Sequence, residues 1–205
     1  TGHPRFRLQP QHRPDRLQDR SRSPCRDIRN ALLHGRKSRQ IQELVDPLPA
    51  IDELVSTILS QNTNDVNRDK AFFALVDKYP DWNSVRTAPE AEVIDCIRIS
   101  GLANQKGPRI QKVLQQIQDE RGNLDLNFLR EMQIDDAKSW LTKFNGVGPK
   151  TAAIVLCFSL GIPAFPVDTH IYRVTGRLGL RPEKMNVEDA HTHLESLFDP
   201  SLYFS

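Results

Sequence analysis

Apolar side chains recur every three or four residues along most of the chain from about Arg26 onward, which is the spacing of one face of an α-helix. In PLPAIDELVSTILSQN this stripe consists of Ile51, Leu54, Val55, Ile58 and Leu59. Similar stripes, often flanked by proline or glycine, predict further helices. They cover DVNRDKAFFALVDKYP, APEAEVIDCIRIS, NQKGPRIQKVLQQIQDERG and residues 134–144, 148–161, 168–179 and 186–198. No segment shows the sustained alternation of a strand, so the predicted fold class is all-α with short helices and many turns.

The segment WLTKFNGVGPKTA predicts a helix, a tight turn and a second helix. Gly146 and Gly148 permit backbone angles that other residues resist, and they let the backbone approach a bulky partner. Pro149 suits the first position of the second helix. Free backbone N–H groups at such a helix start favour a phosphate group. A plain αα-hairpin is the alternative, but the complete string favours binding to the DNA backbone, and residues 101–114 look like a weaker copy of it.

Lys150 is an unusual residue for its position, because the helix dipole disfavours a cation in the first turn by a few tenths to about 1 kcal/mol. The helix behind it, TAAIVLCFSL, is apolar nearly all round, which predicts burial. Both effects favour the neutral amine. A neutral lysine is a nucleophile that can form a Schiff base. The alternative interpretation is a lysine that contacts phosphate.

Asp168 begins the segment DTHIYRV and is predicted to be the N-cap of its helix. The helix before it rises roughly 17 Å, and residues 161–167 can span roughly 23 Å when extended. The chain can therefore return to the level of Lys150. An amine and a carboxylate at one opening are the two groups needed to cleave a glycosidic bond with a lysine nucleophile. We therefore expect Lys150 and Asp168 to face each other across a cleft that accepts a DNA base.

Composition and charge change the picture mainly at the N-terminus. Residues 1–26 are rich in Arg, Pro and Gln and poor in aliphatic side chains, which predicts a disordered basic tail. Eleven Lys and Arg against three Asp lie in residues 1–40, and seven basic against two acidic residues lie in 138–184. Concentrated positive charge suits a phosphate-binding face. The tail is either an arm that tethers DNA or an extension from cloning or gene calling.

The cysteines and the hydropathy of the chain bound its compartment. Cys25, Cys96 and Cys157 form no ligand spacing, so no metal site is expected in this chain, and they suit a reducing compartment. No apolar run reaches the roughly 20 residues of a membrane span, so no membrane partner is expected. We expect a cytoplasmic protein, nucleoid-associated in a prokaryote, with the nucleus left open. We also expect both ends of the chain to be cut.

Together, FNGVGPKTA and the downstream FPVDTHIYRVTGRLGL resemble the helix-hairpin-helix (HhH-GPD) DNA glycosylases, and specifically their endonuclease III-like branch. The resemblance covers about 45–205 and includes ELVSTILSQNTNDVNRDKAF and ISGLANQKGPRIQKV. It implies a two-lobed helical glycosylase domain over residues 27–205, with the hairpin motif at about 137–160 and the C-terminal segment missing.

The same resemblance implies roles for individual residues. Lys150 matches the Schiff-base lysine and Asp168 the aspartate of the family motif. Gln61 and Asn62 fall in the loop that fills the gap left by the extruded base, and the sequence leaves open which of them does so. The residues implied in DNA binding are Gly146, Val147, Gly148, Thr151, Gln61 and Asn62.

The activity implied is a base-excision-repair DNA glycosylase with apurinic/apyrimidinic lyase activity. Its partner would be double-stranded DNA that contains a damaged base, with oxidised pyrimidines as the expected substrates, and it would act as a monomer. One alternative is a monofunctional mismatch glycosylase, although such relatives typically lack lysine at position 150. The other is a non-catalytic helix-hairpin-helix module of a larger protein, which would leave Asp168 unexplained.

Two features depart from the family pattern. Asn145 stands where many members have proline. The branch usually carries four closely spaced cysteines that bind an iron–sulfur cluster near the C-terminus, and this chain has no such set. We therefore expect no cofactor in this chain. Either the chain is cut before that segment, so that the full-length protein carries a four-iron–four-sulfur cluster, or it belongs to a subgroup without the cluster.

Overall fold

The structure, a computed structural model, describes residues 47–203. The tail predicted at 1–26 and the helical segment expected up to residue 46 lie outside these residues. Every regular element within the described range is helical and none is a strand, which confirms the all-α prediction. The α-helices are α2 (Ala50–Ser60), α3 (Asp65–Lys78), α4 (Trp82–Thr87), α5 (Glu90–Ile97), α6 (Ala103–Arg121), α7 (Ile134–Thr142), α8 (Pro149–Ile154), α9 (Thr169–Arg177) and α10 (Val187–Leu197). The shorter turns are the 3₁₀ segments η1 (Arg98–Ser100), η2 (Asn127–Glu131) and η4 (Pro200–Leu202), and the π-helical segment η3 (Val155–Ser159).

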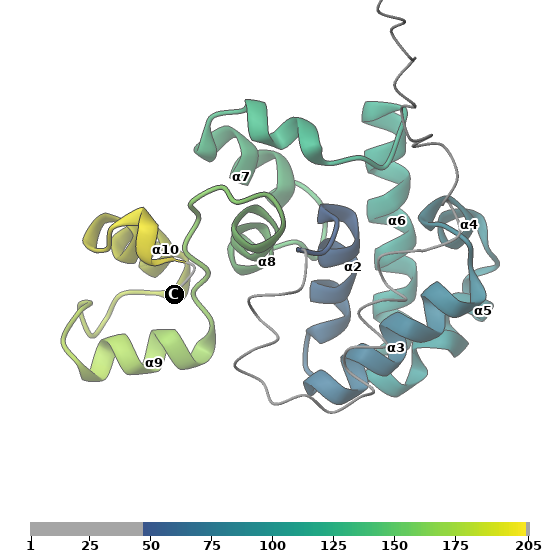
Figure 1. The fold of residues 1–205 in the computed structure, drawn as a ribbon. Coiled ribbons are helices and arrows are strands. Elements are labelled where there is room, and N and C mark those ends of the chain that lie inside the picture. The colour runs from purple at the N-terminus through teal and green to yellow at the C-terminus, as the bar shows by residue number, and fades with distance from the viewer. Residues whose placement is uncertain (1–46, 204–205) are drawn as a thin grey trace, which may run out of the picture.

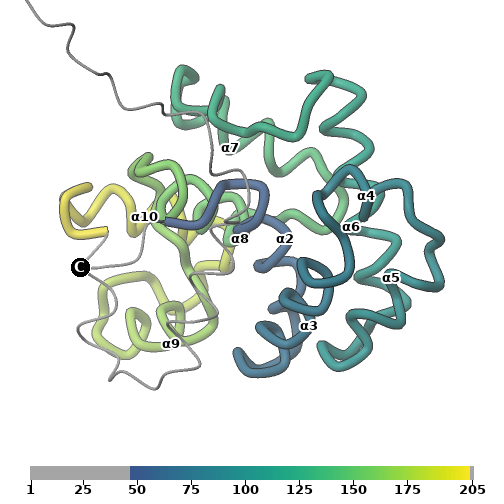
Figure 2. The backbone as a smooth tube through the Cα atoms, turned by 45° about the vertical axis from the view of Figure 1, so that its right-hand side comes forward, coloured from purple at the N-terminus to yellow at the C-terminus, as the bar shows by residue number. Residues whose placement is uncertain are grey.

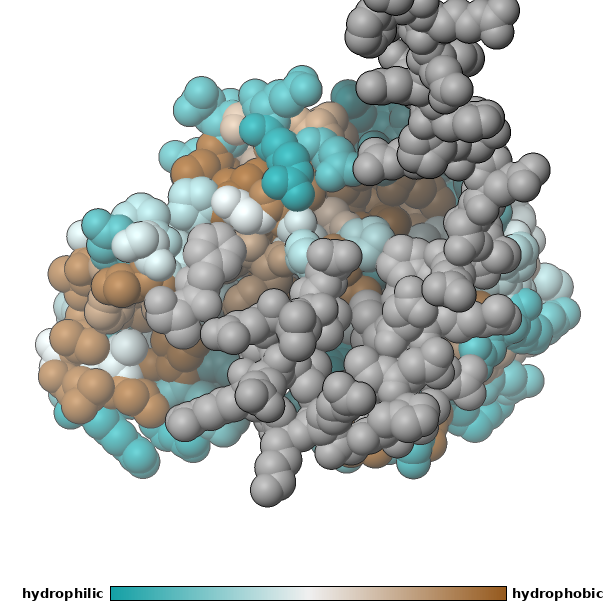
Figure 3. Space-filling view, viewed as in Figure 1, coloured by the Kyte–Doolittle hydropathy of each residue, from teal (hydrophilic) through white to brown (hydrophobic). Residues whose placement is uncertain are grey.

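The helices form a larger and a smaller lobe. In Figures 1 and 2, α2 to α6 lie together on one side, α7 and α8 occupy the centre, and α9 and α10 lie on the other side. One hydrophobic cluster extends through the larger lobe from α2 to η3. A second, smaller cluster joins Val167 to Ala190 and Leu194 of α10. Apolar side chains also gather on the visible outer face of the smaller lobe (Figure 3). Val174 and Leu178 are among the exposed apolar residues of this lobe. This arrangement confirms the two-lobed helical fold that the resemblance implies.

Most predicted helix ends are close to the observed ones because capping residues mark them. Asn64 caps α3 by accepting a hydrogen bond from the N–H of Asn67, and α3 ends just before Pro80. Gly122 ends α6 in the left-handed conformation, with φ of +71°. Neither α4 nor η2 was predicted from the sequence. Six residues, as in α4, are too few to show a repeating apolar stripe, and only Val85 of that helix is buried.

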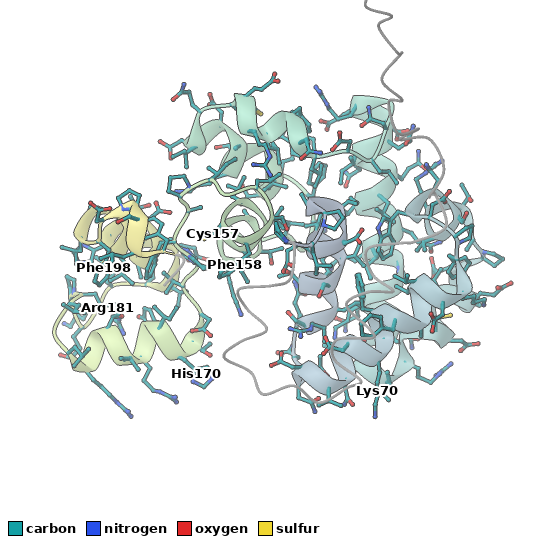
Figure 4. All side chains as sticks on the ribbon, viewed as in Figure 1. Lys70, Cys157, Phe158, His170, Arg181 and Phe198 are labelled. Carbon is teal, nitrogen blue, oxygen red and sulfur yellow. The ribbon has the colours of Figure 1, made fainter. Side chains whose placement is uncertain are left out.

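The helix predicted at 148–161 is divided into two parts. The α-helix α8 ends at Ile154, and the π-helical segment η3 continues from it. Within η3, Phe158 is 48% exposed, whereas its neighbour Cys157 is fully buried. Both lie on the central helix between α2 and the smaller lobe (Figure 4). A single π turn has nearly the same apolar spacing as an α turn, so the sequence pattern could not separate them.

Within residues 47–203, no helix combines the length and the apolar character that crossing a membrane requires.

Candidate active site

The predicted hairpin is present between α7 and α8, and apolar side chains fix its turn. Phe144 and Val147 are buried in the large core, and the N–H of Val147 donates to the carbonyl of Phe144 at 3.0 Å. The Val147 side chain therefore anchors the turn in this core. Any contact of this residue with DNA would come from its backbone.

The two glycines of the hairpin have different reasons to be glycine. Gly146 has φ of +90°, and an added Cβ would lie 2.1 Å from Cδ of Arg109. Gly148 does not use the backbone freedom that glycine permits: its φ is −90° and its ψ is 178°. A Cβ at Gly148 would meet nothing within 4 Å. Neither the backbone nor packing against the described residues requires glycine there, which leaves space for a partner outside the chain.

Lys150 lies in the first turn of α8 and is exposed. Burial of the helix behind it, which the sequence predicts, does not extend to Lys150. The helix itself is buried, since Thr151 and Ala152 face the protein interior. The result is an exposed amine on an immobilised helix. Thr151 is buried, so any contact of this residue with DNA would, as for Val147, come from its backbone.

The lysine of the second, weaker hairpin has the opposite environment. Lys106 on α6 is only 1% exposed, and its Nζ donates to the carbonyls of Leu59 and Ser100, each at 2.8 Å. Burial lowers the pKa of Lys106, and the charge of Arg109 lowers it further. This lysine binds carbonyl groups at the ends of α2 and η1. The two hairpins therefore look alike in sequence but present different groups to the outside.

Asp168 is the N-cap of α9, as predicted. One carboxylate oxygen, Oδ1, accepts both capping bonds, from the N–H of His170 at 2.9 Å and of Ile171 at 2.7 Å. The other oxygen takes no part in these bonds. The end of α9 that carries His170 is the end nearer the centre of the molecule (Figure 4). No hydrogen bond or ion pair joins Asp168 to Lys150 within the described part of the chain, and the expected cleft between them stays a prediction.

The loop that leads into Asp168 is held by α7 and α10. The N–H of Phe165 donates to Oε1 of Glu195 at 2.8 Å, and Glu195 also forms an ion pair with Lys138 at 2.6 Å. Nδ1 of His191 lies 3.0 Å from the Phe165 carbonyl. None of these three residues was predicted to support the site, because nothing in the local sequence pattern links α7 and α10 to a loop so distant in the chain.

His191 should make the stability of this lobe depend on pH. Burial lowers the pKa of His191 below its usual 6.5, and the nearby charge of Lys138 adds to this, while the Phe165 carbonyl, Glu195 and Glu188 oppose it. Between the folded pKa and 6.5, the unfolded chain binds more protons than the folded chain. Stability is therefore lost as the pH falls below about 6.5, by at most about 1.4 kcal/mol per pH unit for one group.

The measurement is the melting temperature between pH 5 and 8. We expect His191→Asn, which keeps a polar group near Nδ1, to show a smaller loss at acidic pH than the unchanged chain. His193→Asn, two residues further along α10, serves as the control and should retain the loss. Equal pH dependence in the unchanged chain and in His191→Asn would contradict the assignment.

Two exposed loop residues have strained backbones. Among residues 47–203, Asn62 and Leu102 are the two non-glycine residues with positive φ, at 53° and 51°. Asn62 is exposed and Leu102 is 46% exposed, so an unpartnered apolar side chain lies at the start of α6. Such backbone conformations cost roughly 1–3 kcal/mol and cluster at functional sites. Asn62 was predicted from the sequence as a site residue, and Leu102 was not.

Gln61 differs from its neighbour Asn62 because both the nitrogen and the oxygen of its side-chain amide form hydrogen bonds within the protein. Its Nε2 donates to the carbonyl of Gly146 at 3.0 Å, and its Oε1 accepts from Arg109 at 2.9 Å. The structure thus joins Gln61 and Gly146, which are 85 residues apart. Of the two candidates for the gap in DNA, Asn62 is the exposed one and Gln61 the anchored one.

A hollow of about 520 Å³ opens along α9 and the loop after it. Its lining consists of Tyr172, Arg173, Gly176, Arg177, Gly179, Arg181 and Glu183. Neither Lys150 nor Asp168 lines it, so it is not the base pocket that the sequence predicts. Arg181 lies over the Tyr172 ring, 3.4 Å from its centre, and closes one side of the hollow.

The residues present do not fit an iron–sulfur cluster. Within residues 47–203 no group of three or more His, Cys, Asp or Glu side chains could hold a metal ion. Cys96 and Cys157 are free, and burial raises the pKa of the Cys157 thiol to about 11, which keeps it protonated at neutral pH. Cys25 lies outside the described residues.

Sequence comparison places these features in a known family. The HhH-GPD superfamily of base excision DNA repair proteins matches residues 55–200. A protein of Arabidopsis thaliana named as a DNA glycosylase is 34% identical over 209 aligned positions, which cover 88% of this chain and 71% of that protein. Endonuclease III of Sulfolobus acidocaldarius is 35% identical over 147 positions, which cover 71% of this chain and 63% of that protein.

Structural comparison agrees with the sequences. A non-covalent complex of endonuclease III with DNA and a trapped covalent endonuclease III–DNA intermediate each match with a TM-score of 0.65 and 26% identity. Each match covers 88% of this chain, and it covers 80% and 78% of the respective endonuclease III chains. The chain therefore belongs to the HhH-GPD superfamily of base excision DNA repair proteins, in its endonuclease III-like branch of DNA glycosylases.

Proposed function

We propose that this protein excises oxidised pyrimidine bases from double-stranded DNA and then cleaves the strand at the abasic site, acting as a monomer. The observation that carries the proposal is the exposed amine of Lys150 on the buried second helix of the hairpin. A monofunctional mismatch glycosylase would not need a nucleophilic amine at this position. The trapped covalent intermediate of the similar endonuclease III supports the same chemistry.

The proposed reaction uses Lys150 and Asp168 in separate roles. The base leaves the helical stack, because its C1′ atom cannot be reached inside the duplex. The Lys150 amine attacks C1′, the bond to the base breaks, and the base departs with the bonding electrons and takes up a proton. The attached nitrogen then loses a proton, its lone pair expels the ring oxygen O4′ from C1′, and O4′ takes up a proton. The protonated Schiff base formed in this way leads to strand cleavage. Asp168 stabilises the positive charge that develops on the sugar, and its oxygen outside the capping bonds is the one suited to this.

The structure changes where the neutral amine must come from. Lys150 is exposed in the chain without DNA, so the described residues do not remove water from its amine. We propose that bound DNA covers Lys150 and supplies the desolvation, which favours loss of the ammonium proton. The open space at Gly148 supports close approach of the DNA backbone to this turn.

Two strained loop residues are proposed to enter the duplex when the base leaves. Asn62 is the candidate that fills the gap, because it is exposed while the Gln61 amide is engaged by the protein. Leu102 is proposed as an apolar wedge between base steps, a role in which proteins use exposed Leu, Ile, Met and Phe. Both residues have the left-handed backbone that makes a side chain stand out from a tight turn.

A panel of lesion-bearing duplexes tests the proposal with the 205-residue chain. We expect a single-turnover assay to show base loss followed by strand cleavage with oxidised pyrimidines, strand cleavage alone with a preformed abasic site, and no reaction with undamaged DNA. Base loss that leaves the strand intact would favour the monofunctional mismatch glycosylase. Binding without any base loss or strand cleavage would favour the non-catalytic module.

A further inference from the structure

Arg109 connects three parts of the proposed DNA-binding face. It belongs to α6, and its NH1 donates to Oε1 of Gln61, the residue that ends α2, at 2.9 Å. Nε2 of the same Gln61 amide donates to the carbonyl of Gly146 in the hairpin turn, at 3.0 Å. Neighbouring Asn62 begins the loop proposed to enter the gap. One arginine thus holds the side chain that links this loop to the hairpin.

The contact of Arg109 with the hairpin is also steric. Its Cδ and Nε would lie 2.1 and 2.4 Å from a Cβ at Gly146, so the arginine stem passes directly over that glycine. Gly146 has a left-handed φ, and its carbonyl accepts a hydrogen bond from Gln61. Arg109 is half-buried, and its planar guanidinium can hold an amide oxygen in a fixed direction better than a flexible ammonium can. The turn, the glutamine and the arginine are therefore packed as one unit.

We propose that Arg109 and Gln61 form a latch that couples the hairpin turn to the loop carrying Asn62. When the hairpin contacts the DNA backbone, the latch sets the position of Asn62 relative to the duplex. Arg109 is thus a positioning residue that acts through Gln61 and does not touch the reacting atoms. The inference rests on the proposed function, because it assumes that Asn62 fills the gap left by an extruded base.

A double-mutant cycle tests the latch in single-turnover assays. We expect Arg109→Ala and Gln61→Ala each to slow base excision on the order of ten-fold, as for loss of a hydrogen bond to a charged group. The double variant should be no slower than the slower single variant, because both substitutions remove the same latch. Strand cleavage at a preformed abasic site should change by less than about three-fold, since no base has to leave the stack.

Two reference variants complete the design. Asn62→Ala should show the same profile as the latch variants, with excision slowed and abasic cleavage retained. Arg86→Ala is the matched control, because the Arg86 side chain also donates to a glutamine oxygen on α6, that of Gln115 at 2.6 Å, and should leave both reactions unchanged. Independent, multiplied losses in the double variant would overturn the latch. An equal loss of abasic cleavage in Arg109→Ala would also overturn it.

Failure of the proposed function can be told apart from failure of the latch. If the unchanged chain neither excises bases nor cleaves abasic DNA, the proposed function fails. The latch is then judged by thermal unfolding of the same variants. The shifts in melting temperature from Arg109→Ala and Gln61→Ala should again be non-additive, and additive shifts would overturn the latch.

Discussion

Replacing Lys150 by glutamine should abolish covalent trapping of DNA by borohydride. Borohydride reduces a Schiff base to a stable amine, so the unchanged chain should give a covalent protein–DNA adduct with abasic or oxidised-base DNA. Glutamine has no amine with which to form the Schiff base. DNA affinity should stay within a few-fold, because at most one phosphate contact is lost. The measurement is the adduct band on a denaturing gel, beside an anisotropy titration of DNA binding.

A second lysine of the same hairpin provides the control. Lys143 is exposed, and it forms an ion pair with Glu120 and lies over the Trp140 ring. Lys143→Gln removes the same charge from the same motif and should keep trapping. Persistent trapping in Lys150→Gln would show that another amine is the nucleophile, whereas equal loss in both variants would indicate a general charge effect.

Replacing Asp168 by asparagine should slow base excision by on the order of 10² or more, as for loss of an electrostatic stabiliser of the transition state. The capping bonds should survive, because both go to one oxygen, which asparagine can supply. Asparagine caps a helix about as well as aspartate does. The melting temperature should therefore barely move. Excision rates and thermal unfolding measured on the same preparation separate the catalytic from the structural effect.

Another N-cap aspartate tests whether this result is specific. Asp81 caps α4 in the larger lobe by accepting from the N–H of Ser84 at 2.7 Å. Hydrogen bonds from Ser84 hold the pKa of Asp81 below its usual value. Removing the charge of Asp81 therefore changes the cap of α4. Asp81→Asn should leave excision unchanged. Full activity in Asp168→Asn would remove Asp168 from the proposed reaction.

Features that depend on neighbouring residues were predicted from the sequence, whereas features that depend on the surrounding structure were not. The end of α3 before Pro80 and the start of α9 at Asp168 were predictable, because both depend on neighbouring residues. The environment of Lys150 was not, because a helix can be buried while one of its first residues points outward. The π-helical turn at η3 was also missed, because five residues of apolar sequence fit either type of helix.

By itself, the sequence determined the helical class, the hairpin and the capping role of Asp168, since local propensities and short-range hydrogen bonds set all three. Only the tertiary structure decided which side chains make contacts within the protein and which remain exposed to a partner. It buried Lys106 and exposed Lys150, although both follow a glycine turn. It also joined Gln61 to Gly146 by a hydrogen bond and left Asn62 exposed. These outcomes depend on packing between helices far apart in the chain, and the contacts that such packing creates leave no mark on the local pattern.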